Sequence, residues 1–172
     1  MDAADPATEC FVPVIRKWQT LYSLSGHLPS SREFQPDHLK EFPSRISVIE
    51  PVRGGEDFRY VIYAAAVVHA GGVDMTGYHV SDFFDEKLRT AVTKNLRAVL
   101  SDEEPRIWRY RHNWKDRSYD YCSLYIPLVH GAEKRFRIHS IIVNTDPTRR
   151  QLYSGRFEHT RMAVKPDQFR ET

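Results

Sequence analysis

The spacing of apolar residues predicts an amphipathic helix near the start of the chain. Apolar side chains recur every three or four residues between Cys10 and Leu24, as they do along one face of an α-helix. Pro13 is tolerated only in a first turn, and Gly26 is a typical residue at a helix end. The apolar stripe consists of Phe11, Val14, Ile15, Trp18, Leu21 and Tyr22. It packs either on its own domain or, wholly or in part, against another subunit.

Alternation of apolar and polar residues predicts five strands. The first two, residues 46–49 and 58–65, flank a glycine turn with the sequence VRGGED, which is typical of a hairpin. Apolar residues at helical spacing then predict a helix that runs to Leu100 with Asp85 as its N-cap. The remaining strands are predicted at residues 106–114, 119–129 and 136–144.

This order of elements indicates an α+β fold. Strands grouped before and after a helical crossover favour a five-stranded antiparallel sheet that is covered on one face by helices. A concave space is expected between the sheet and the segment from Ala64 to Leu100. The chain divides into an N-terminal extension with the amphipathic helix (1–27), the domain itself (28–145) and a polar C-terminal tail (146–172).

Composition narrows the function classes. The 172 residues suit one domain with extensions, and 25 Lys+Arg against 23 Asp+Glu leave a net charge of only +2. That balance gives no sign of a nucleic-acid-binding face. No apolar run approaches the roughly 20 residues that span a bilayer. The acidic N-terminus lacks the apolar core of a secretory signal. Two cysteines, Cys10 and Cys122, are too few for a disulfide framework, so we expect a soluble cytoplasmic domain.

Three short motifs occur in a fixed order along the chain. They are LPSSR at residues 28–32, DFRY at 57–60 and GVDMTG at 72–77. With the leading helix, they give the chain a resemblance to the PAS domain, and more narrowly to a bacterial family of short, stand-alone PAS-like proteins. The first motif carries one extra serine relative to the L-P-S-R pattern of that family. The match extends from about Phe11 to Asn144.

The resemblance implies a sensor fold of five antiparallel strands with a helical connector. It implies a non-catalytic sensory or regulatory module that signals by association with another protein, with the leading helix as the contact of a homodimer. The turn motif then serves structure rather than chemistry. Gly72 and Gly77 supply positive backbone angles, while Asp74 and Thr76 bond nearby amides and hold the turn closed.

One face of the later strands is rich in aromatic residues, and it either closes as core or leaves room for a small ligand. His139 is either a polar anchor in that pocket or an ordinary sheet histidine. The candidate pocket residues are Tyr63, Phe83, Trp108, Tyr110, Tyr125 and His139. Arg106, Arg109 and Arg111 alternate with the aromatic residues. They are better explained as a solvated outer face than as an anion or nucleic-acid surface.

Cofactor chemistry finds little support. None of the eight histidines has a partner at metal-ligand spacing. Haem-binding relatives of the PAS fold carry a histidine on the long helix, and residues 86–100 contain none. Flavin-binding relatives need a cysteine in the region that reads HVSDFFDEKLR here. No nucleophile elbow, phosphate loop or paired carboxylate suggests an enzyme. The alternative is a small α+β enzyme or carrier that holds a substrate in the aromatic cavity.

Overall fold

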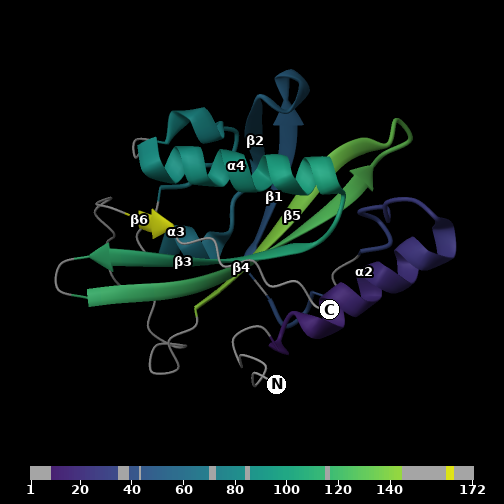
Figure 1. Ribbon diagram of the computed structural model, residues 1–172, viewed down its shortest axis with the longest axis horizontal. Coiled ribbons are helices and arrows are strands. Elements are labelled where there is room, and N and C mark those ends of the chain that lie inside the picture. The colour runs from purple at the N-terminus through teal and green to yellow at the C-terminus, as the bar shows by residue number, and fades with distance from the viewer. Residues whose placement is uncertain are drawn as a thin grey trace.

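The computed structural model describes residues 9–34, 39–42, 44–69, 73–83, 86–114, 117–144 and 162–164. They form an α+β fold around an antiparallel sheet with the strand order β2-β1-β5-β4-β3-β6 (Figure 1). The helices are α2 (Val12–Ser25), α3 (Ala65–His69) and α4 (Glu86–Asp102), with 3₁₀ turns η2 (Arg53–Gly55) and η3 (Val80–Asp82). The strands are β1 (Ile46–Val52), β2 (Asp57–Ile62), β3 (Arg106–Trp114), β4 (Arg117–His130), β5 (Arg135–Asn144) and β6 (Met162–Val164).

The predicted α+β class and the antiparallel sheet are confirmed, with differences at several boundaries. β1 continues through Pro51, which pairs with Phe58 across the hairpin. β2 ends at Ile62 because the chain turns into α3 at Ala65. The segment expected to be a polar tail contributes β6, which pairs with β3. The predicted N-cap Asp85 lies outside the described residues.

Helices cover both faces of the sheet, so the expected one-sided arrangement is wrong. α4 lies on one face and α2 on the other (Figure 1). The cause is visible in β4, where every residue from 121 to 128 is buried. A central strand that is buried on both faces needs an apolar layer on each side. The expected solvated outer face is therefore a second core, and Ile107 is buried in it.

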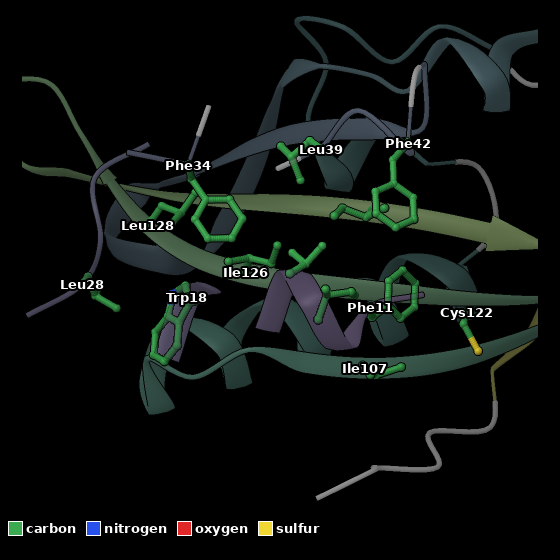
Figure 2. Close-up of a cluster of buried hydrophobic side chains, with 13 residues drawn as sticks. Phe11, Trp18, Leu28, Phe34, Leu39, Phe42, Ile107, Cys122, Ile126 and Leu128 are labelled. Atoms are coloured by element: carbon green, nitrogen blue, oxygen red, sulfur yellow. The ribbon is translucent and has the colours of Figure 1, made fainter. Parts of the chain in front are cut away.

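We call the core beneath α2 the outer cluster (Figure 2). Aromatic residues from α2 and from the segment after it pack onto aliphatic residues of β4 and β5. Its buried members are Phe11, Val14, Trp18, Leu28, Phe34, Leu39, Phe42, Ile107, Cys122, Leu124, Ile126, Leu128 and Ile141. The helix ends as predicted at Gly26, which has a φ of 68° and donates its N–H to the carbonyl of Tyr22.

The stripe of α2 faces its own domain. Phe11, Val14 and Trp18 are buried in the outer cluster, and Ile15 and Leu21 pack against it in part. Tyr22 stacks on Trp18 but is 39% exposed. A second subunit would therefore meet the partly exposed side of the stripe rather than its whole length.

The LPSSR motif closes an open strand edge. β3 begins opposite Tyr125, so the last residues of β4 have no strand partner on that side. Ser31 donates its N–H to the carbonyl of Val129, and Val129 donates its own to the carbonyl of Pro29. The hydroxyl of Ser31 also shares a 2.7 Å hydrogen bond with Nδ1 of His130. The motif thus substitutes for the missing strand.

Trp18 completes the same edge. Its indole N–H donates to the carbonyl of Pro127 over 2.8 Å. In an extended strand the N–H and carbonyl of one residue point to the same side. The missing N–H of Pro127 therefore also faces the side on which β3 has ended. A proline fits this otherwise central strand because no ladder bond is lost there.

The GVDMTG motif covers the other edge of the sheet, along β2. The N–H of Gly77 donates to the carbonyl of Tyr60, and the N–H of Tyr60 donates to the carbonyl of Tyr78. The expected turn chemistry is confirmed. A carboxylate oxygen of Asp74 accepts the N–H of Thr76, and the hydroxyl of Thr76 accepts the N–H of Tyr63. Gly77 has a φ of 85°. Gly72 lies outside the described residues.

We expect Trp18→Ala to lower the free energy of unfolding by roughly 3–5 kcal/mol, because it removes a buried indole and leaves a cavity. Urea denaturation followed by circular dichroism measures the loss. Gln19→Ala is the matched control on the same helix, since Gln19 is exposed and lies off the apolar stripe, and it should change stability by less than about 0.5 kcal/mol. Equal losses in the two variants would contradict the position of Trp18.

Candidate functional site

The site lies between the sheet and α4, in what we call the inner cluster. Apolar residues of α4 pack onto a layer of aromatic residues from β2, β3 and β4. The buried members are Ile49, Phe58, Tyr60, Val80, Val92, Leu96, Val99, Trp108, Tyr110, Tyr121, Tyr125 and Ile138. Three predicted pocket residues, Trp108, Tyr110 and Tyr125, are among them. Two more, Tyr63 and Phe83, pack against the edge of the cluster.

The aromatic rings of the inner cluster contact one another. The ring of Tyr60 meets that of Tyr63 edge to face at a centroid distance of 5.0 Å, and it stacks on Phe83 at 6.0 Å. Trp108 meets Tyr125 edge to face at 5.0 Å. Such contacts add roughly 0.5–1.5 kcal/mol per pair beyond burial. The alternation of β3 and β4 therefore places these residues together as predicted, and in this structure they pack as core.

A chain of polar groups crosses the inner cluster from the helix to the sheet. Asn95 of α4 donates from Nδ2 to the hydroxyl of Tyr110 over 3.1 Å. That hydroxyl shares a 2.7 Å hydrogen bond with the hydroxyl of Tyr125. Asn95 is only 4% exposed, and a buried amide needs such a partner. The chain joins α4, β3 and β4 through polar atoms surrounded by rings.

Sequence reasoning missed Asn95, although a signal was present. Residue 95 lies three positions after Val92 and four before Val99, so it falls on the apolar stripe of the helix. A polar side chain at a core position is informative because burial without a partner is costly. Tyr60 lies in a predicted strand (58–65) but was not predicted as a site residue, and its ring contacts two of the predicted residues.

The buried hydroxyls of the inner cluster are held in their protonated form. Burial raises the pKa of Tyr60 and Tyr110 well above the ordinary value, and it raises the pKa of Tyr63 to about 12. Burial also raises the pKa of Tyr125, although hydrogen bonds from Tyr110 and two neighbouring serines oppose the shift. All four residues remain neutral hydrogen-bond donors and acceptors near pH 7, which suits them to neutral polar groups.

His139 does not belong to this site, which corrects its assignment to the pocket. It lies opposite Ile126 of β4 and Val48 of β1 in the sheet register. Ile126 is in the outer cluster, whereas Ile138, the residue before His139, is in the inner cluster. Successive side chains of a strand point to opposite faces. The choice of face was open in the sequence because apolar residues line both sides of β5.

His139 lies in a charged part of the outer face. Its ring is nearly buried, and its Nδ1 has no hydrogen-bond partner in the structure. Nearby, Glu50 accepts Nε of Arg137 at 2.7 Å and a guanidinium nitrogen of Arg59 at 3.2 Å. Burial lowers the pKa of His139 to about 4, and the positive charges of Arg137 and His130 contribute. The imidazole is therefore neutral near pH 7.

No protein-family model and no curated protein matches the chain. Among the described residues, no helix has the length and apolar character needed to cross a membrane. Within that same part of the chain, no three or more side chains of His, Cys, Asp or Glu gather as a metal would require.

The pKa of His139 predicts acid sensitivity. In the unfolded chain His139 binds a proton near pH 6.5, whereas in the folded chain its imidazole stays neutral down to about pH 4. The contribution of His139 to the free energy of unfolding is therefore fully present above pH 6.5. It falls by roughly 3 kcal/mol as the pH drops toward 4. His139→Leu should flatten this part of the curve, measured by urea denaturation at pH 7, 5.5 and 4. An unchanged slope in the variant would refute the assignment.

Tyr110→Phe should lower the free energy of unfolding by about 1–3 kcal/mol, because it leaves the buried amide of Asn95 without its acceptor. Tyr78→Phe is the matched control, since it removes a hydroxyl from a side chain that is 56% exposed. It should have an effect within about 0.5 kcal/mol. Thermal or urea denaturation compares the two, and an equal effect would count against the polar chain.

Proposed function

We propose that this protein is a cytoplasmic PAS-type sensory or regulatory module without a catalytic site. In this proposal a small ligand or a partner protein acts on the inner cluster, and the change passes to the helices. The output is association with another protein. The proposed module neither makes nor breaks covalent bonds.

The topology supports the proposal. β1 and β5 pair in the middle of the sheet, with β2 on one side and β4 and β3 on the other. The connector between β2 and β3 holds α3, η3 and α4, and it returns over the face that carries the aromatic residues. The resemblance in the motifs implies this kind of antiparallel sheet with a helical connector. The finer assignment to the PAS family remains our inference.

The observation that carries the function is the polar chain from Asn95 to Tyr125. It joins the helix to the sheet through two hydrogen bonds within an apolar layer. A ligand with a neutral polar group can exchange for one of these bonds, while its apolar part contacts the rings. Such a ligand alters the position of α4 if it binds one arrangement better than the other. A sensor requires this kind of coupling, in which ligand binding at a buried site changes the position of a helix at the surface.

The exposed end of α2 is the proposed contact for a homodimer. Tyr22 is 39% and Leu24 is 80% exposed, although both are large and apolar in part. We expect Leu24→Glu to shift a dimer toward monomer in sedimentation velocity without loss of the fold, because the side chain makes little contact with its own domain. Trp18 is unsuitable for this test because it is buried. A protein that is monomeric at all concentrations would contradict the dimer.

Native purification followed by mass spectrometry identifies a bound small molecule, and hydrogen exchange then tests the proposed coupling. We expect the ligand to slow amide exchange in α4 and in β3 together, since both contribute to the polar chain. Asn95→Leu keeps the shape of the side chain but removes the amide, and it should abolish the effect on α4. Tyr78→Phe serves as the control that retains it.

Two outcomes would refute this function. A ligand that binds without any change in the exchange of α4 would remove the signalling mechanism. Chemical turnover of the bound molecule by the purified protein would instead favour the enzyme or carrier alternative. Measuring both turnover and the hydrogen exchange of α4, in the parent protein and in the Asn95→Leu variant, separates these cases.

A further inference from the structure

A groove lies on the opposite side of α4 from the residues that contact the inner cluster. It has a volume of about 580 Å³ and runs between α4, the turn that joins β1 to β2, and η3. The groove is largely open to solvent. Its lining includes the four cations Arg53, Arg89, Lys94 and Arg97. Only two acidic residues, Glu56 and Asp57, line the same groove.

Two of the arginines are held in place by main-chain carbonyls. Arg97 donates Nε to the carbonyl of Gly55 over 3.1 Å and Nη2 to the carbonyl of Glu56 over 2.8 Å. Arg89 donates Nη1 to the carbonyl of Phe83 over 2.9 Å. Among the described residues, neither guanidinium forms an ion pair with a carboxylate. Each is thus positioned without a paired carboxylate in the described part of the chain, and several of its five N–H groups remain available.

Asp57 offsets part of this positive charge, but among the described residues it forms no ion pair with these cations. Its carboxylate accepts the hydroxyl of Ser81 at 2.7 Å and the N–H groups of Phe58 and Ser81 at 2.8 and 3.3 Å. Burial alone would raise the pKa of Asp57, but these hydrogen bonds outweigh it and hold the pKa below its ordinary value. The carboxylate is therefore committed to the turn it stabilises. Glu56, the other acid, is exposed at the rim.

The cations are spread along the helix rather than gathered at one point. Arg89 and Arg97 are eight residues apart, which separates their Cα atoms by about 12 Å along the axis. Lys94 and Arg97 are three apart and share one side of the helix. Thr90 and Thr93 lie between the two ends, and their hydroxyls are suitable donors. An elongated ligand with several negative groups matches this arrangement better than a single small anion.

We propose that this groove binds a small polyanion whose negative groups are phosphates, such as an oligophosphate or a phosphorylated metabolite. The fork of a positioned guanidinium matches two phosphate oxygens, and lysine adds a mobile charge. The site is separate from the inner cluster and stands whether or not that cluster takes a ligand. Because Arg97 and the η2 turn join α4 to the β1–β2 hairpin, an occupied groove ties these two elements together.

The test uses the whole chain and isothermal titration with sodium tripolyphosphate, with ATP in a second arm. We expect one site per chain, and weaker binding when the salt concentration is raised from 50 to 200 mM. Lys94→Gln and Arg53→Gln remove exposed charges at the groove, and each should weaken binding about five- to tenfold. Thermal unfolding of both variants should match that of the parent protein. Equal affinity for the two probes assigns recognition to the triphosphate, and tighter binding of ATP adds a contact with the nucleoside.

Arg16→Gln is the matched control. It removes the same charge from α2 on the other side of the sheet, where the side chain is exposed, and it should leave the affinity unchanged. An equal loss in this variant would show that binding follows only the net charge and would overturn the site. No measurable binding at millimolar probe would overturn it too. Tighter binding of a hexaglutamate peptide than of tripolyphosphate would do the same, because it assigns the groove to an acidic protein partner.

Discussion

The fold depends on how the free edge of β4 is closed. The pairing of β4 with β3 stops at Tyr125, whereas β4 itself continues to His130. The main-chain groups left without a strand partner are bonded instead by Trp18 and by the Pro29–Ser31 segment. Buried main-chain groups without partners cost stability, so this contact is required rather than incidental. It also fixes α2 over the outer face, which creates the second core and leaves the inner face to α4.

Two of the three sequence motifs, LPSSR and GVDMTG, have the same physical role. The LPSSR segment closes the edge of β4, and the GVDMTG turn closes the edge of β2 through Gly77 and Tyr78. Neither brings a reactive group to a cavity. Both segments occupy strand edges at which another strand could otherwise add. Residues suited to ligand contact are found elsewhere, on the aromatic face and on the outward side of α4.

The sequence predicted the features that depend on neighbouring residues alone. The end of α2 at Gly26 and the shared face of Trp108 and Tyr110 follow from the backbone preference of glycine and the two-residue repeat of a strand. The second covered face did not follow, because apolar residues on both sides of β4 were taken as a one-sided pattern. His139 was misplaced for a related reason: only pairing with Ile126 decides its face. The role of Asn95 depends on the position of Tyr110, which lies 15 residues away in the sequence. The only local signal was the place of Asn95 on the apolar stripe of the helix.

The contact between Trp18 and Pro127 spans 109 residues of chain. At a synthesis rate of roughly 5–20 residues per second, α2 leaves the ribosome about 5–20 s before the strand that covers it exists. During that interval Phe11, Val14 and Trp18 lack the residues of β4 against which they are buried in the folded domain. The apolar stripe of the helix is therefore buried fully only after β4 has been made, and folding cannot be completed from the N-terminal residues alone.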